Sequence, residues 1–431
     1  MKKIIFGLVF IFLLVVTFDI YLNKNNTVTL SNESVDDHTK LISMMLETEA
    51  SSGSYEVSSL TAWPSDGYIF NSELSKCENG STLSWNETNK QVVFSGNITD
   101  KCYVYFDVYN PPKVLSEVCN DGGVLSSCII DLSNKSTSTI TGIYYHDSSL
   151  AGGAGDNSYR YAGSNPNNYV CFGSDDEICP LENLYRIIGV IDGKVKLILA
   201  DAATTDMLGT DGGYLGDYIN SGWDSENYKN NGDLSKIGVY YWCDPEQSTL
   251  PLCSTIFTNL TDNFITNLTK KNSKWKTMID DTTWYLSNMT YANGAEINAK
   301  TAYEYDVGIN KNIFETFGNK IGMMYLSEYY YAASPDNWKL PGVDKDGSWN
   351  DGVWFGNDYS KVKDNNWLYI GLYEWTFSRN SYDAFFIFYG GSISSSGING
   401  NYYIARPTFN LSENVSYVRG TGTISDPIRV V

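Results

Sequence analysis

Two arginines near the C-terminus, Arg379 and Arg406, lie in a weakly charged stretch, EWTFSRNSYDAFFIFYGGSISSSGINGNYYIARPTFNLS, residues 374 to 412. A guanidinium binds a carboxylate well because two parallel N–H groups match the two carboxylate oxygens. Arg406 lies in an apolar strand before Pro407, a setting typical of a buried structural residue. We expect Glu374 or another buried carboxylate as its partner; contact with a ligand is the alternative. The residues expected to hold this scaffold are Glu374, Trp375, Arg379 and Arg406.

Between the two arginines the chain is built mainly from Tyr, Phe, Ser, Gly and Asn. Antibody paratopes use Tyr, Ser, Gly and Asn because rigid amphipathic rings combine with adaptable hydrogen-bonding groups. We predict a hairpin from Asp383 to Tyr403 that presents aromatic rings to a ligand. The expected ligand-binding residues are Tyr382, Tyr389, Tyr402 and Tyr403, joined by Tyr329, Tyr330, Tyr331, Trp349 and Trp354 from neighbouring loops. The alternative is that these rings only pack in the core.

Two Asp/Asn-rich loops carry oxygen ligands of the type that calcium needs, namely Asp336, Asn337, Asn350 and Asp351. The triplet Trp349-Asn350-Asp351 is like the WND element of calcium-dependent lectins, but the usual Glu-Pro-Asn or Gln-Pro-Asp companion is missing. The segment DKDGSWNDG also lacks EF-hand spacing. We therefore expect a solvated loop and no cofactor, with a calcium site as the alternative.

Signals for catalysis are weak in this chain. Carboxylates that could serve a glycosidase, such as Asp336, Glu328 and Glu374, are too abundant to indicate an active site. The sequence contains no G-x-S-x-G elbow and no P-loop. We therefore expect no catalytic residues and no enzyme, and keep a surface hydrolase as an alternative.

Eight cysteines fall into four close-spaced pairs, and none has the C-x-x-C spacing of a zinc or redox site. Only two histidines are present, so a Cys/His metal site is hard to assemble. Disulfides persist in oxidising compartments outside the cytosol. We expect four local disulfides: Cys77–Cys102, Cys119–Cys128, Cys171–Cys179 and Cys243–Cys253.

The N-terminus combines Lys2 and Lys3 with an apolar run that begins at Ile4. No small-residue cleavage site follows this run, so we expect an uncleaved signal-anchor over residues 1–23, with the lysines inside. The predicted location is the plasma membrane, single-pass, with the C-terminal part extracellular. A cleaved signal peptide is the alternative, and both interpretations export the rest of the chain.

The formal net charge of −20 arises from 50 acidic and 30 basic residues. Such a surface repels phosphate backbones, which makes nucleic acid a poor candidate partner. An acidic surface also keeps a chain rich in tyrosine soluble outside a cell. The composition therefore favours a folded, exported protein.

The pattern of apolar residues predicts five segments: the anchor at 1–23, a polar stalk at 24–50, a small antiparallel β-domain at 51–110, a linker with a short Cys loop at 111–141, and a main domain at 142–431. Asp192-Gly193 between two apolar runs predicts a tight hairpin turn. The apolar side chains of a helix near 255–268 share one face. A second short helix follows, over the segment SKWKTMIDD.

The last third of the chain resembles a C-type-lectin-like domain, through EWTFSR (374 to 379), the hairpin after it, and ARPTFNL (405 to 411). Formylglycine-generating-enzyme-like domains share this arrangement, but their reactive C-terminal cysteines are absent, since the last cysteine is Cys253. Together with NLYRIIGVIDGKVKLI and KIGMMYLSEYYYAASPDNW, these motifs are similar to uncharacterised surface-protein families of gut Firmicutes. The resemblance implies an α+β, C-type-lectin-like domain with long loops. In retroelement-diversified relatives of that fold, the variable positions lie in the corresponding hairpin.

These observations predict a membrane-anchored extracellular binding protein whose lectin-like domain binds a glycan or a protein on another surface. A structural cell-envelope protein without a specific small ligand is the alternative.

Overall fold

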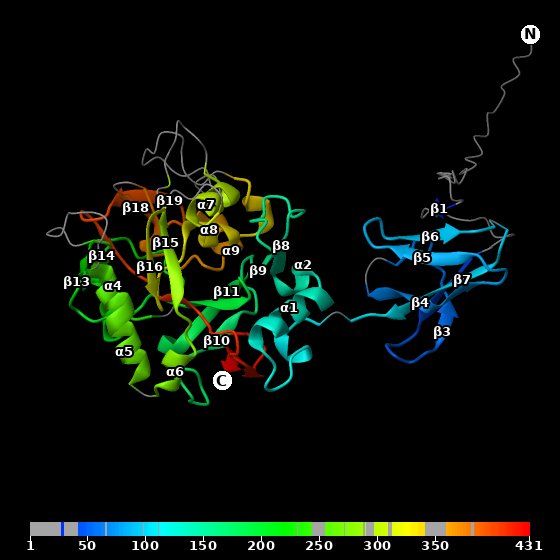
Figure 1. Cartoon of the computed structure of the whole chain (residues 1–431), viewed down its shortest axis with the longest axis horizontal. Coiled ribbons are helices and arrows are strands. Elements are labelled where there is room, and N and C mark those ends of the chain that lie inside the picture. Colours follow the sequence, from blue (N-terminus) through cyan, green and yellow to red (C-terminus); the bar gives the residue numbers. More distant parts are fainter. Residues whose placement is uncertain are drawn as a thin grey trace, which may run out of the picture. The chain divides into compact units, whose positions relative to one another are not determined.

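The computed structural model describes residues 27–29, 42–64, 67–97, 99–110, 112–230, 232–243, 255–270, 272–287, 289, 297–308, 313–340, 359–380 and 383–431. The chain divides into two compact units, Met1–Pro111 and Pro112–Val431, which are described separately (Figure 1).

The N-terminal unit contains two small sheets with the strand orders β1-β6-β5 and β3-β2-β7-β4. Every second residue of β6 is buried, so one face of its sheet turns inward. Val92, Val104 and Phe106 form the core between the strands, with Trp63 and Trp85 packed against them. The strands are β1 (Thr27–Thr29), β2 (Ile42–Glu47), β3 (Tyr55–Val57), β4 (Tyr68–Cys77), β5 (Thr82–Asn86), β6 (Gln91–Ser95) and β7 (Cys102–Val108).

Two expectations for this unit are corrected by strand β2. Its residues fall within the expected polar stalk at 24–50, yet β2 lies inside the sheet between β3 and β7. Ile42, Met44 and Leu46 alternate toward the core, which is the two-residue period of a strand. Because β2 runs parallel to β7, the sheet is mixed and not purely antiparallel.

The C-terminal unit is organised around one larger sheet of order β21-β12-β11-β10-β23-β22, to which β9 and β8 are added through β11. Three smaller sheets, β13-β14-β20, β15-β16 and β17-β18-β19, complete the unit. The strands of the larger sheet are β8 (Ile143–His146), β9 (Ser158–Tyr161), β10 (Tyr169–Cys171), β11 (Leu184–Ile191), β12 (Lys194–Leu199), β21 (Thr408–Asn410), β22 (Tyr417–Arg419) and β23 (Ile428–Val430). The others are β13 (Tyr214–Asp217), β14 (Gly238–Tyr241), β15 (Thr282–Ser287), β16 (Ile313–Asn319), β17 (Glu374–Arg379), β18 (Asp383–Ile387), β19 (Ile393–Gly397) and β20 (Tyr402–Tyr403).

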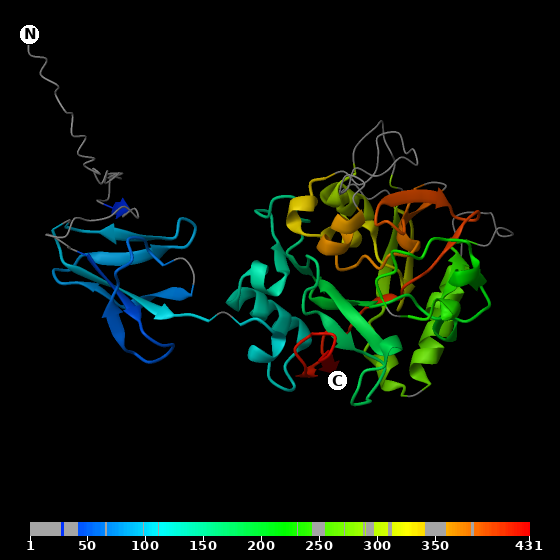
Figure 2. The same cartoon turned by 180° about the vertical axis from the view of Figure 1, so that it is seen from behind.

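The predicted turn at Asp192-Gly193 is confirmed. It joins β11 to β12, and both residues have positive φ angles, 50° and 77°. Asp tolerates this left-handed backbone better than most residues and Gly adopts it without strain, which explains the dipeptide at this position. Figure 2 shows the two strands side by side in the middle of this unit.

The helices of this unit are short and cover the sheets from several sides (Figure 1). The predicted helix near 255–268 is present as α4 and α5, joined by a π-helical turn at Thr258–Asn263, and its apolar face is buried through Leu260, Phe264 and Leu268. The helices are α1 (Leu125–Lys135), α2 (Ser138–Thr141), α3 (Thr205–Leu208), α4 (Thr255–Phe257), α5 (Phe264–Thr269), α6 (Lys274–Thr277), α7 (Ala299–Asp306), α8 (Leu326–Tyr331) and α9 (Tyr359–Asn365).

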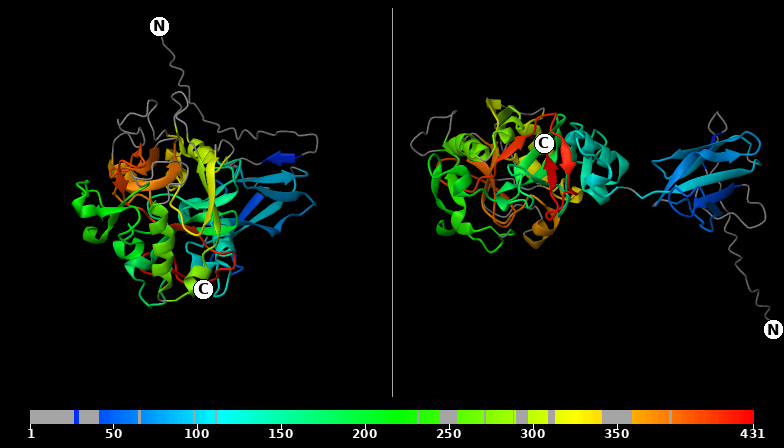
Figure 3. Two further views of the ribbon diagram at one scale, coloured as in Figure 1. Left: turned by 60° about the vertical axis from the view of Figure 1, so that its left-hand side comes forward. Right: turned by 90° about the horizontal axis from the view of Figure 1, so that it is seen from below.

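The expected linker at 111–141 is instead part of the C-terminal unit. Its helix α1 buries Leu125, Cys128, Ile129 and Leu132, which follow the i, i+3, i+4, i+7 spacing of one helical face. Backbone hydrogen bonds connect the start of this helix to the segment before β22, where Leu125 N donates to Val415 O at 3.0 Å. Figure 3 shows the C-terminal strands next to α1.

The expected fold class and location are corrected as well. The structure is β-rich and built from several small sheets, because short apolar runs alternate with turns rich in Gly, Asn and Asp. In the described part of the chain, no helix is both long enough and apolar enough to span a bilayer. This finding contradicts the fold class that contains a membrane anchor and the single-pass plasma-membrane location. The anchor segment 1–23 itself lies outside the described residues.

Three of the four expected disulfides are present: Cys77–Cys102, Cys119–Cys128 and Cys171–Cys179. Cys77 and Cys102 are directly opposite each other on β4 and β7. Cys243 is also disulfide-bonded, while its expected partner Cys253 lies outside the described residues. The chain is therefore a disulfide-bonded protein.

Candidate functional site

The segment from Asp383 to Tyr403 forms a hairpin of β18 and β19, followed by the short strand β20, but its aromatic rings mostly face inward. Tyr403 is 1% exposed, and its ring centroid lies 4.4 Å from Phe386 and 4.5 Å from Trp375. Tyr389 and Tyr402 are half-buried. Of the expected ligand-binding residues, Tyr382, Trp349 and Trp354 lie outside the described residues.

The three consecutive tyrosines of α8 are core residues, which corrects their expected exposure. Tyr329, Tyr330 and Tyr331 are at most 1% exposed. Each hydroxyl donates to a backbone carbonyl, and Tyr330 reaches Ile297 O at 2.7 Å. All six residues of this helix are buried, so it offers no solvent-facing side. The hairpin and α8 therefore do not gather into an exposed aromatic surface among the described residues.

Glu374 and Arg406 form a buried, two-pronged ion pair. Arg406 Nε donates to Glu374 Oε1 at 2.7 Å, and Nη2 donates to Oε2 at 2.8 Å. Both side chains are about 2% exposed. Burial raises the pKa of Glu374, and the Arg406 charge opposes that rise. Trp375 and Arg379 are also buried; Trp375 Nε1 donates to Tyr240 O at 2.8 Å. All four residues expected to be structural are therefore buried in the C-terminal unit.

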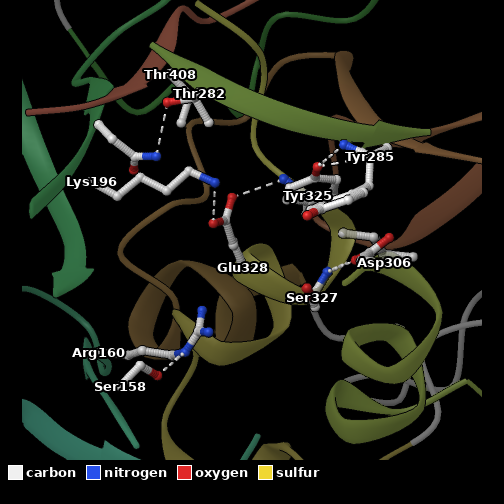
Figure 4. Close-up of polar contacts among 12 residues, drawn as sticks. Ser158, Arg160, Lys196, Thr282, Tyr285, Asp306, Tyr325, Ser327, Glu328 and Thr408 are labelled. Carbon is white, nitrogen blue, oxygen red and sulfur yellow. Dashed lines mark hydrogen bonds and ion pairs between the residues drawn. The ribbon is translucent and has the colours of Figure 1, made fainter. Parts of the chain in front are cut away.

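A second set of buried charges lies between the larger sheet and helices α7 and α8 (Figure 4). Lys196 on β12 points toward Glu328 on α8, with 2.5 Å between Nζ and Oε1. The ammonium also lies 4.9 Å from the ring centroids of both Trp284 and Tyr325. Arg160 on β9 pairs with Asp156 at 2.7 Å. Each cation of this cluster thus has a carboxylate partner, which is the arrangement expected of a structural network.

Asp306 on α7 is the most perturbed acid of this cluster. Its carboxylate accepts hydrogen bonds from Ser378 Oγ and from Ser327 N, and the residue is fully buried. Burial raises the pKa of Asp306 to about 7, because a low-dielectric interior disfavours the charged form. Between about pH 4 and pH 7 the folded state keeps this proton and the unfolded state does not, so the stability that it contributes is lost as pH rises.

Asp306→Asn is therefore expected to flatten the pH dependence of stability, because asparagine resembles the protonated acid. Between pH 5 and pH 8 the variant should gain about 2–3 kcal/mol relative to the native protein. Urea unfolding at both pH values measures this difference. Asp131→Asn, an exposed acid on α1, is the control and should show no such gain. If the stability of the native protein and of Asp306→Asn changed with pH in the same way, the raised pKa of Asp306 would be contradicted.

The described residues also form an open pocket of about 470 Å³, a size typical of small-molecule sites. Its walls come from segments far apart in the sequence: the loop before β10, Arg186 on β11, the end of β12, Lys229 and Asn230, and the stretch from α9 to Ile370. Arg186, Lys229 and Lys363 supply three cationic groups. Asp364 is the only acidic residue of the lining.

Arg186 lies buried in the pocket wall without a carboxylate partner among the described residues. Its guanidinium lies 4.3 Å from the ring centroid of Tyr169 and 4.6 Å from that of Trp367. Its N–H groups donate only to neutral oxygens: Asn168 Oδ1, Trp367 O, Asn165 Oδ1 and Pro166 O. Burial lowers the pKa of Arg186 to about 10, which still leaves it charged at neutral pH.

Lys229 has the same kind of environment. Its ammonium donates to Asn366 O at 3.2 Å and to Tyr369 O at 3.0 Å, and the described part of the chain offers it no carboxylate at ion-pair distance. Burial first, and then the nearby charge of Arg186, lower the pKa of Lys229 to about 8. An anion in the pocket would favour the charged form of Lys229. One buried and one half-buried cation without a carboxylate partner in the described part of the chain, within a protein of net charge −20, could therefore hold an anion.

The residues considered for calcium do not form a site in the described structure. Asp336 and Asn337 lie on a 3₁₀ turn at Pro335–Asn337, and Asn350 and Asp351 lie outside the described residues. No cluster of three or more His, Cys, Asp or Glu side chains that could hold a metal ion occurs where the structure describes the chain.

The sequence interpretation missed the pocket residues. One signal could have found Arg186, which stands as the only charged residue within the apolar strand LYRIIGVI. A buried charge in such a strand needs a partner, and the strand itself contains no acidic residue. Lys229 and Lys363 lie in ordinary polar stretches, and only the tertiary structure brings them to Arg186.

A scan against protein-family models, a search of curated proteins and a search of solved structures each return no match to this chain. The resemblance to surface proteins of gut Firmicutes therefore stays a prediction. The candidate site rests on the geometry of the pocket alone.

Proposed function

We propose that this chain is an exported binding protein whose basic pocket takes a small anionic ligand. The observation that carries the proposal is the placement of Arg186 and Lys229 in one pocket wall, where, among the described residues, each donates only to neutral oxygens. Leaving a buried charge without a counter-charge costs free energy, which a bound anion would recover. The disulfides support export, since such bonds persist in oxidising compartments.

The pocket is a better candidate than the aromatic hairpin. A binding surface needs side chains that a ligand can reach, and the described hairpin rings are buried or half-buried against one another. The rings therefore support a packing role for the hairpin, whose strand β18 pairs with β17 and places Ile387 opposite Glu374. In the pocket, by contrast, the Lys363 side chain is exposed.

The proposal predicts that small anions stabilise the protein through the pocket lysines. Citrate, sulfate and glucuronate should be compared with sodium chloride at equal ionic strength, because a ligand that binds only the folded state raises the melting temperature. At least one anion should raise it in the native protein. A charge-assisted hydrogen bond contributes about 1.5–3 kcal/mol, so Lys229→Met should weaken binding roughly ten- to hundredfold.

Two further variants make the result specific. Lys363→Met removes an exposed charge and should reduce the anion effect without changing the fold. Lys276→Met removes an exposed lysine of α6, outside the pocket, and should leave the effect intact. Equal shifts in all variants would identify a general salt effect and would refute the pocket, as would the absence of any shift.

A further inference from the structure

We infer that the ligand of this pocket is a hydroxylated carboxylic acid of about one sugar residue, such as a uronic acid. This inference rests on the proposed function and narrows its ligand class. Four features of the pocket lead to it: its charge balance, its supply of free N–H groups, its neutral polar lining and its size.

The charge balance excludes a zwitterion as the best ligand. Arg186, Lys229 and Lys363 carry three positive charges and Asp364 carries one negative charge, which leaves a net charge of +2. An amino acid with an uncharged side chain brings as much positive as negative charge and would leave that excess unchanged. A carboxylic acid without an ammonium group reduces it.

The supply of free N–H groups favours a carboxylate over a phosphate. Arg186 uses four of its five N–H groups on protein oxygens, and Lys229 uses two of its three. Arg186 and Lys229 therefore each have one donor left. Two donors match the two oxygens of a carboxylate, whereas a phosphate presents three oxygens.

The remaining lining suits hydroxyl groups. Ser164, Asn165 and Asn230 add a hydroxyl and two amides to the pocket. Asn165 accepts from Arg186 through Oδ1, which leaves its amide N–H groups available. Asp364, an exposed carboxylate, can only accept hydrogen bonds while it is ionised, so it favours a ligand that also carries donors. A volume of about 470 Å³ accommodates one sugar ring and its substituents.

Calorimetric titration with four probes tests the ligand class: D-glucuronate, D-glucose, D-glucose 6-phosphate and the zwitterion L-serine. Glucuronate should bind at least tenfold more tightly than glucose, and more tightly than the other two. Tighter binding of glucose 6-phosphate would overturn the sugar acid and leave the anion pocket standing. Tighter binding of serine would contradict the charge balance and overturn the sugar acid. No binding of any probe, or glucuronate binding that Lys229→Met leaves unchanged, would overturn both the inference and the proposed function.

The variant Asp364→Ala distinguishes two roles for Asp364: accepting a hydrogen bond from a ligand hydroxyl, or only repelling anions by its negative charge. If Asp364 accepts from a ligand hydroxyl, the variant should bind glucuronate several-fold more weakly and bind acetate, which has no hydroxyl, more tightly. Tighter binding of both probes would show that Asp364 only repels anions and would contradict the hydroxylated class. Asp131→Ala, far from the pocket lining in sequence and exposed, should change neither affinity.

Discussion

Arg406→Met is expected to destabilise the C-terminal unit by about 3–5 kcal/mol, because it leaves Glu374 as an unpaired charge in the core. The pair is almost fully buried, and its two bonds are 2.7 and 2.8 Å long. Arg406 Nη2 also donates to Leu368 O at 2.8 Å, so its loss frees a carbonyl next to the pocket wall. Urea unfolding at pH 7 measures the difference.

Two controls separate the lost ion pair from lost packing. The double variant Arg406→Met/Glu374→Met removes both charges and should regain much of the stability, since apolar residues of similar volume often replace a buried pair. Lys194→Met breaks a half-exposed pair with Asp280, and should cost no more than about 1 kcal/mol. A cost that small for Arg406→Met would show that the buried pair does not hold the fold.

Gly371→Ala is expected to cost about 3–5 kcal/mol and to abolish binding in the pocket. Gly371 has a φ of +81°, and a Cβ atom there would lie 1.8 Å from the backbone oxygen of Asn227. The left-handed backbone and the clash each contribute about 1–3 kcal/mol. Because Lys229 N donates to Ile370 O at 3.0 Å, the displaced segment would carry Lys229 out of position.

Unfolding and glucuronate titration of Gly371→Ala measure both effects. Gly400→Ala is the matched control, because a Cβ at Gly400 meets nothing within 4 Å and its φ is not in the left-handed region. The control should retain both stability and binding. If Gly371→Ala behaved like Gly400→Ala, the close approach of these two segments would not position the pocket.

Local chemistry made part of this molecule predictable. Asp192-Gly193 specifies its turn because few dipeptides accept two positive φ angles. Close spacing made the Cys119–Cys128 and Cys171–Cys179 bridges predictable, and Arg406 in an apolar segment favoured a carboxylate partner such as Glu374. Each of these inferences depends on a constraint that acts within the segment itself or on a strongly unfavourable unpaired charge.

The remainder depends on contacts between distant segments. Tyrosine suits a binding surface and a core equally well, and only tertiary packing decided that Tyr329 to Tyr331 are buried. The apolar spacing in Leu125–Lys135 is that of a helix, but the Ser and Asn residues of this segment led to the prediction of a linker. The pocket brings Arg186 together with residues up to 184 positions away in the sequence, at Ile370. No local sequence pattern predicts that these residues are close in space.

The most direct test of the binding account is a crystal structure of the full chain grown with sodium glucuronate. The account predicts density for the sugar acid in the basic pocket, with its carboxylate within hydrogen-bond distance of Arg186 Nη1 and Lys229 Nζ. Ring hydroxyls should approach Asp364. A sugar acid bound against Tyr389 and Tyr402 of the hairpin, with the basic pocket empty, would contradict it.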